Sequence, residues 1–221
     1  MKYKAVLFDL DGTLLDTLED LADSMNVVLR EMSLPEHPTE AYRYFIGDGI
    51  GMLARRVLPV DASDEATIER CVADMRDQYT RRWHNKTRLY DGVGEMLDGL
   101  TRRSLRMAVL SNKPHDFTQL IVAHLLGNWR FEHVWGIGRK VPRKPDPAGA
   151  LRLAETMQLT PARMFYLGDT ATDMKTADAA GMFALGAIWG FRTAEELNDN
   201  GAKVLLENPT DLLKWLDGVG N

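Results

Sequence analysis

Two aspartates, Asp9 and Asp11, stand two residues apart directly after an apolar run, Ala5–Phe8. That run is long enough for a buried strand of a parallel sheet. Because side chains alternate along a strand, both carboxylates point the same way if the extended backbone continues to Asp11. Two crowded acids repel each other, and a cation between them or a proton on one of them relieves the repulsion. The alternative is a strand that ends in an Asx-type turn, where Asp and Gly are common.

Polar side chains also follow two later apolar stretches, at residues 105–110 and 164–167. These polar residues are Ser111, Asn112, Asp169 and, one helical turn later, Asp173. Lys144 lies between the two stretches in a segment that two prolines restrain. Each residue alone is also compatible with a helix cap or a solvated loop. Ligands of an open parallel sheet bind at the carboxyl ends of its strands, so the whole set in this order predicts one shared site.

The elements that must position these residues alternate between strands and helices. Strands are expected at residues 5–8, 105–110, 133–137, 164–167 and 183–188. Helices are expected at residues 94–101, 115–126, 147–157, 172–180 and 210–216. This alternation predicts an α/β fold built on a doubly wound parallel sheet.

Residues 17 to 84, between the first and second strands, show only helical periodicity. Helices are expected at residues 17–32, 39–45, 50–57 and 63–79, with Thr17, Thr39 and Ser63 as N-caps. The domain organisation that follows is a catalytic core of residues 1–15 and 87–221 with an inserted all-helical domain, residues 16–86. Cys71 lies on the apolar face of the last of these helices, which favours a packed core thiol over a nucleophile.

The composition restricts the class of protein. The chain has 221 residues, of which 45% are hydrophobic and 27% charged, and its net charge is -5. Because no basic field exists, nucleic acid and anionic membranes are not expected as partners. The single cysteine allows no internal disulfide, and neither a signal-peptide h-region nor an apolar run of membrane-spanning length is visible. A cytoplasmic protein, monomeric or homodimeric, is expected.

The polar residues at the strand ends resemble the four motifs of the haloacid dehalogenase superfamily, and specifically of its phosphatases. The matching segments are Asp9-Leu10-Asp11-Gly12-Thr13, Ser111, Lys144 and Gly168-Asp169-Thr170-Ala171-Thr172-Asp173. The inserted helical domain resembles the small helical cap of this superfamily's first cap class. Its segment Phe45-Ile46-Gly47-Asp48-Gly49-Ile50-Gly51 is similar to the cap loop of phosphoglycolate phosphatases. The resemblance implies a Rossmann-like core with a mobile cap.

The resemblance also implies roles for the acids. Asp9 is expected to be the nucleophile that forms a phosphoaspartyl enzyme. Asp11 is expected to protonate the leaving group and then to activate the hydrolytic water. The expected cofactor is Mg²⁺, held by Asp9, by the backbone carbonyl of Asp11 and by Asp169.

The other motif residues are expected to support this chemistry. Ser111, the neighbouring backbone at Asn112, and Lys144 would bind the phosphate, and Lys144 would neutralise its charge. Asp173 would orient either Lys144 or a metal-bound water. Thr13 would bond near Asp11 or to local backbone.

The expected substrate is a small phosphorylated metabolite, with 2-phosphoglycolate as the first choice. Pyrophosphate and nucleotide or sugar phosphates are the alternatives within the superfamily, and a phosphomutase stays open. Asp11 argues against a dehalogenase, because a halide leaving group needs no acid. Phosphonate hydrolysis in this superfamily needs a Schiff-base lysine from the cap, and Lys86 lies only at the edge of the insert, so this reaction is disfavoured. A non-catalytic binding module would lack a catalytic group, and none is missing. Selectivity is expected to come from insert residues, with candidates Arg43, Gly47, Asp48, Gly49, Arg55 and Arg56.

Overall fold

The structure, a computed structural model, describes residues 2–138 and 141–219. Its centre is a six-stranded sheet in the order β5-β4-β1-β6-β7-β8, and every pairing in it is parallel. The strands are β1 (Ala5–Phe8), β4 (Arg106–Pro114), β5 (His133–Ile137), β6 (Met164–Gly168), β7 (Phe183–Ala187) and β8 (Val204–Leu206). The expected parallel sheet is confirmed, and the strand that carries Asp9 lies in its middle.

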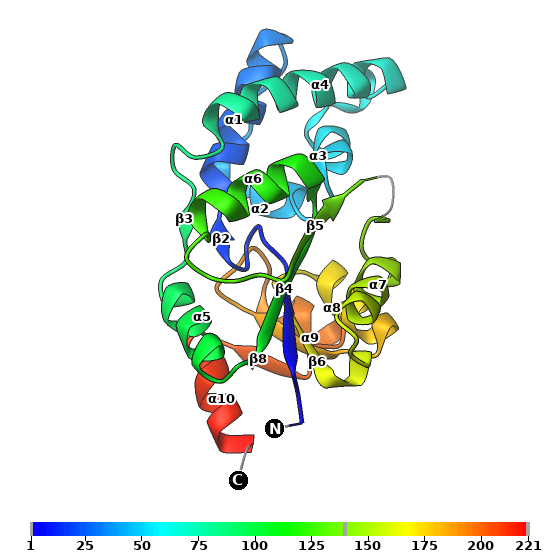
Figure 1. Ribbon diagram of the computed structural model, residues 1–221. Coiled ribbons are helices and arrows are strands. Elements are labelled where there is room, and N and C mark those ends of the chain that lie inside the picture. Colours follow the sequence, from blue (N-terminus) through cyan, green and yellow to red (C-terminus); the bar gives the residue numbers. More distant parts are fainter. Residues whose placement is uncertain (1, 139–140, 220–221) are drawn as a thin grey trace.

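Both faces of the sheet are covered by helices, as a doubly wound fold requires (Figure 1). Along β1, Val6 and Phe8 belong to one hydrophobic cluster, and Ala5 and Leu7 belong to the other. The first cluster includes residues of α5 (Val93–Arg102), α6 (His115–Leu125) and α10 (Asp211–Val219). The second includes residues of α7 (Ala148–Thr156), α8 (Ala171–Ala180) and α9 (Ala194–Asp199). Because both faces are buried, the strands read as continuous apolar runs.

Four helices lie between Asp16 and Arg88 in the sequence and form the helical insert, in the upper part of Figure 1. They are α1 (Leu18–Glu31), α2 (Tyr42–Phe45), α3 (Ile50–Val57) and α4 (Glu65–Arg82), with single 3-10 turns at Thr39–Ala41 and Val60–Ala62. The Cys71 thiol is fully buried 3.6 Å from the sulfur of Met25, and burial raises its pKa to about 11. The prediction of a core thiol is therefore confirmed.

The two chain crossings into and out of the insert pair with each other. Strand β2 (Leu15–Asp16) runs antiparallel to β3 (Arg88–Leu89), and Arg88 contacts Asp16 at 2.9 Å. The buried carboxylate of Asp20 accepts hydrogen bonds from the backbone N–H groups of Lys86 and Thr87. These pairings were not predicted, because a two-residue strand carries too little periodicity to be recognised.

Other details of the sequence prediction differ from the structure. Asp64, and not Ser63, caps α4, because its carboxylate accepts the N–H of Thr67. Thr17 precedes α1 as expected, but its side chain makes no cap hydrogen bond. A short 3-10 turn, Pro161–Arg163, precedes β6, and the strand β8 and helix α9 were missed because both are short. Among the described residues no helix has the length and apolar character needed to cross a membrane.

Candidate active site

The carboxyl ends of β1, β4 and β6 meet because these strands are neighbours and parallel. The nucleophile candidate Asp9 follows β1, and it is 5% exposed. Its Oδ1 lies 2.8 Å from the Nζ of Lys144, and beyond this ion pair it accepts no hydrogen bond from the described residues. The expected neighbourhood of Asp9 and Lys144 is therefore present.

Lys144 is buried among acids, and besides Asp9 its ammonium group contacts Asp173. Its Nζ lies 2.6 Å from Asp173 Oδ1. Asp173 Oδ2 accepts the N–H and the hydroxyl of Thr170 in a capping box at the start of α8, and Oδ1 lies within 3.3 Å of the Tyr166 hydroxyl. Since both oxygens of Asp173 are engaged, this residue positions Lys144, which is the first of its two expected roles.

Asn112 fixes the backbone around Lys144. Its Oδ1 accepts the Lys144 N–H at 2.8 Å, and its Nδ2 donates to the Lys144 carbonyl at 3.2 Å and to the Gly47 carbonyl at 3.0 Å. The Asn112 amide therefore links the Lys144 backbone in the core to the Gly47 backbone in the insert. The expected phosphate contact at Asn112 is through its backbone, and these side-chain bonds do not involve that backbone. Ser111 Oγ accepts the Lys113 N–H at 3.2 Å, so the hydroxyl proton of Ser111 remains available for a ligand.

Asp169 follows β6 and is fully buried. Its Oδ1 accepts the hydroxyl of Thr13, and its Oδ2 accepts the N–H of Phe191, both at 2.9 Å. Thr13 therefore bonds to Asp169, and not near Asp11 as expected. Gly12 lies against this carboxylate with a φ of +87°, and a Cβ there would approach Asp169 Oδ2 to 2.2 Å, so no larger residue fits.

Burial and, after it, crowding of charges raise the pKa values of the buried acids Asp9 and Asp169. Burial raises the pKa of Asp9 to about 7, with Lys144 opposing and Asp173 adding to the shift. Burial, followed by the charges of Asp173 and Asp9, raises the pKa of Asp169 well above its usual range. Oxygen atoms of Asp9, Asp169 and Asp173 lie within 4.8 Å of one another. An all-oxygen set of buried carboxylates with excess negative charge fits a hard divalent cation such as Mg²⁺.

Lys113 is a site residue that the sequence analysis missed. Its Nζ contacts both oxygens of Asp11, at 2.9 and 3.0 Å, and lies 4.6 Å from the ring centroid of Tyr79 in α4. The strand β4 was expected to end at Leu110, but it continues to Pro114. With that extension, the alternation of side chains places Lys113 on the same face as Ser111, and this signal was available in the sequence.

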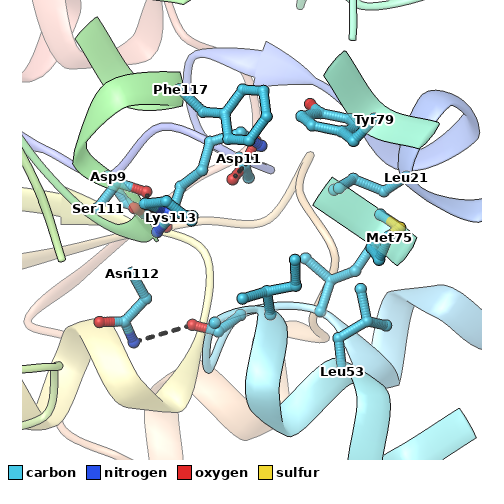
Figure 2. A pocket seen from close by; sticks show the side chains of 15 residues that line it. Asp9, Asp11, Leu21, Leu53, Met75, Tyr79, Ser111, Asn112, Lys113 and Phe117 are labelled. Atoms are coloured by element: carbon cyan, nitrogen blue, oxygen red, sulfur yellow. Dashed lines mark hydrogen bonds and ion pairs between the residues drawn. The ribbon is translucent and has the colours of Figure 1, made fainter. Parts of the chain in front are cut away.

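A pocket of about 60 Å³ opens between the sheet and the insert (Figure 2). Its polar lining residues are Asp9, Asp11, Ser111, Asn112, Lys113 and Tyr79. Its apolar lining residues are Leu21, Ile46, Ile50, Leu53, Met75, Pro114 and Phe117, and the lining also includes Gly47 and Gly49. The pocket therefore joins polar residues of the core to a mostly apolar wall of the insert.

The loop before α3 lies on the core. Besides the Gly47 carbonyl at Asn112, Asp48 Oδ1 accepts the hydroxyl of Thr172 at 2.8 Å. Arg56 donates to Asp48 and to the Phe45 carbonyl, and it does not line the pocket. The loop therefore contacts the core directly, and the hydrogen bonds of Arg56 fix the loop from the insert side.

Two other arginines of the insert lie away from the pocket lining. The half-exposed Arg55 pairs with Glu65 at 2.7 Å. Arg43 donates to the Gly190 carbonyl at 3.0 Å, while the core residue Arg192 donates to the Arg43 and Ile46 carbonyls. The suggestion that Arg55 and Arg56 reach the substrate is not supported, because each is engaged by an acid elsewhere in the insert.

A substitution at Gly49 tests whether the close approach of this loop to the core is needed for activity. Its backbone, with φ 83° and ψ 166°, is a conformation essentially reserved for glycine, and a Cβ would lie 3.0 Å from the Asn112 carbonyl oxygen. We expect Gly49→Ala to lower kcat/KM by about tenfold or more, since the strain amounts to roughly 1–3 kcal/mol. Gly51→Ala is the control: a Cβ there meets nothing within 4 Å, and alanine favours the helix. Equal effects of both substitutions on kcat/KM would contradict the expectation.

Comparison with known proteins agrees with this geometry. A sequence model of the haloacid dehalogenase-like hydrolase family matches residues 6–187. Phosphoglycolate phosphatases of Pseudomonas putida and Mannheimia succiniciproducens are each 31% identical to the chain; the first match covers 95% of this chain and 78% of the relative, the second 96% and 98%. The crystal structure of a predicted phosphoglycolate phosphatase from Haemophilus somnus superposes with a TM-score of 0.89 at 28% identity, covering 98% of this chain and 99% of that one.

The chain therefore belongs to the haloacid dehalogenase-like hydrolase family, and within it to the phosphatases that resemble phosphoglycolate phosphatase.

Proposed function

We propose that the protein is a Mg²⁺-dependent phosphatase that hydrolyses a small phosphomonoester through a phosphoaspartyl intermediate. The observation that carries the proposal is that Asp9 and Asp11 both line one small pocket, with Lys144 against Asp9 and with Asp169 buried close by. Dehalogenation would leave the second acid, Asp11, without a task. The coupling of a nucleophile to an acid at one pocket is what ester hydrolysis requires.

In the first step, a carboxylate oxygen of Asp9 attacks phosphorus, the ester P–O bond breaks, and Asp11 gives its proton to the leaving oxygen. In the second step, Asp11 takes a proton from a water that attacks phosphorus, which releases inorganic phosphate and regenerates Asp9. Lys144 and Ser111 hold the transferring oxygens. Asp9, Asp169 and the backbone carbonyl of Asp11 would hold Mg²⁺, which when bound screens the repulsion between the nucleophile and the substrate dianion.

We further propose that residues 16–86 act as a cap over a core of residues 1–15 and 87–221. The paired crossings β2 and β3 support this division, because both links lie at one place and can serve as one hinge. The reciprocal contacts of Arg43 and Arg192 would hold the cap closed. Closure excludes bulk water from the phosphoaspartate.

The substrate that suits the pocket best is 2-phosphoglycolate. Apart from the Tyr79 hydroxyl, the wall of the pocket is apolar on the insert side, so most hydroxyl groups of a sugar or nucleotide would be left without partners there. The names of the relatives agree with this choice. The small carboxylate-bearing leaving group needs little room beyond the phosphate.

A panel of phosphate esters and pyrophosphate, ranked by kcat/KM with Mg²⁺, tests this choice. We expect 2-phosphoglycolate to exceed nucleotides, sugar phosphates and pyrophosphate by at least about tenfold, since unpaired buried polar groups oppose their binding. A sugar phosphate or pyrophosphate at the top of the ranking would refute the substrate assignment. Phosphatase activity itself would stand in that case.

A further inference from the structure

The hydroxyl of Tyr79 is buried and lacks a hydrogen-bond partner among the described residues. The residue is 3% exposed, lies in α4 of the insert, and lines the pocket. Burial raises the pKa of Tyr79 to about 12, although the Lys113 ammonium group opposes the shift, so the phenol is a neutral donor. A buried donor without a partner opposes folding, and its presence is explained if a ligand supplies the acceptor.

Lys113 provides a positive charge beside this hydroxyl. Its ammonium group is bound to both oxygens of Asp11 and lies against the Tyr79 ring. Of the described residues that line the pocket, Lys113 alone is cationic. Figure 2 shows Asp11, Lys113 and Tyr79 together at the upper side of the pocket, with Leu53 at the lower side. When Asp11 carries the proton that it gives to the ester oxygen, the Lys113 charge is not balanced and this corner is suited to an anion, while the rest of the insert wall is apolar.

Given the proposed function, on which this inference rests, we propose that the Tyr79 hydroxyl and the Lys113 ammonium group bind the carboxylate of the substrate. The contact between Lys113 and Asp11 and the connectivity of the substrate are compatible with this role. Asp11 must reach the ester oxygen, and Lys113 contacts Asp11. In 2-phosphoglycolate a single carbon separates the ester oxygen from the carboxyl carbon, so the carboxylate lies next to the group that protonates the ester. Selectivity then resides in Tyr79 and Lys113 and not in Arg55 or Arg56.

The test compares 2-phosphoglycolate with 2-phosphoglycolamide, in which an uncharged amide of the same shape replaces the carboxylate. For Tyr79→Phe we expect kcat/KM with 2-phosphoglycolate to fall by about 10- to 100-fold, as for the loss of a hydrogen bond to a charged group, and to fall much less with the amide. Lys113→Met should reduce the preference for the carboxylate further. We expect Tyr79→Phe to unfold at the same temperature as the wild type or higher, because it removes an unpaired buried hydroxyl.

Tyr42→Phe is the matched control. Tyr42 is a buried tyrosine of the insert outside the pocket lining, and its hydroxyl donates to Asn26. The substitution Tyr42→Phe should lower the unfolding temperature and leave the ratio of kcat/KM for the two substrates unchanged.

The outcomes separate the two proposals. If the wild type shows no preference for the carboxylate, the substrate assignment fails and this inference fails with it. If the wild type prefers the carboxylate but Tyr79→Phe lowers kcat/KM equally with both substrates, or with neither, only the inference is refuted. A lower unfolding temperature of Tyr79→Phe would show that the hydroxyl is already paired in the free protein and would also refute it. If Lys113→Met does not fold, Tyr79→Phe decides alone.

Discussion

Asp9→Asn is expected to abolish turnover and covalent phosphorylation, with a loss in kcat on the order of 10⁴-fold or more, as for removal of other enzymatic nucleophiles. Asparagine keeps the shape of the side chain beside Lys144, but its amide is a poor nucleophile towards phosphorus. The unfolding temperature should not fall, because one of three crowded acids becomes neutral. Steady-state rates, mass spectrometry of rapidly quenched protein and thermal unfolding measure the three quantities.

Asp11→Asn is the matched comparison, since it changes the neighbouring acid in the same way. Loss of a general acid costs roughly 10²–10⁴-fold for alkyl esters. The loss is much smaller for formation of the phosphoenzyme from p-nitrophenyl phosphate, whose leaving group needs no proton. This variant should therefore still carry phosphate on Asp9. Substantial activity of Asp9→Asn, or equal effects of the two substitutions on every substrate, would show that Asp9 is not the nucleophile.

Removal of divalent cations with EDTA is expected to eliminate phosphatase activity, and Mg²⁺ is expected to restore it. The reason is the buried acid cluster, in which Lys144 alone cannot balance Asp9, Asp169 and Asp173. Ca²⁺ should inhibit, because its larger shell can bind the Asp9 carboxylate through both oxygens and remove the attacking one. Mg²⁺ should also raise the unfolding temperature, with about 2.7 kcal/mol of stabilisation at a hundredfold excess over Kd.

Asp169→Asn provides the control for this experiment. It removes one charge from the cluster and keeps the hydrogen bond from Thr13, but its NH2 group cannot accept the Phe191 N–H, so the thermal shift is measured against the variant's own unfolding temperature without metal. Both the activation and the thermal shift by Mg²⁺ should then weaken together. Full activity of the wild type in excess chelator would rule out the metal site.

The fold and the core of the site were predictable because their signals are local. Asp9, Ser111 and Asp169 each follow an apolar strand, and parallel strands that are neighbours must bring such residues together. The helical insert was predicted by the change of period after Asp16.

The wall of the pocket was not predictable, because it depends on contacts between distant residues. Tyr79 lies on an apolar helical stripe and looks like an ordinary core residue; only the fold shows that its hydroxyl reaches a site built from β1 and β4. Arg55 and Arg56 looked available to a ligand, but Glu65 and Asp48 bind them. The hydrophobic periodicity of a sequence does not predict which acid such an arginine will pair with.

The position of β1 in the middle of the sheet has a consequence during translation. This strand leaves the ribosome well before its neighbours β4 and β6, which begin at residues 106 and 164. The helices of the insert can pack on one another before that, while both edges of β1 stay unpaired. A nascent or truncated chain that ends before β6 therefore has Asp9 without a site and exposes an apolar strand edge, which favours aggregation. Binding of such chains by a chaperone, compared with full-length protein, measures this exposure.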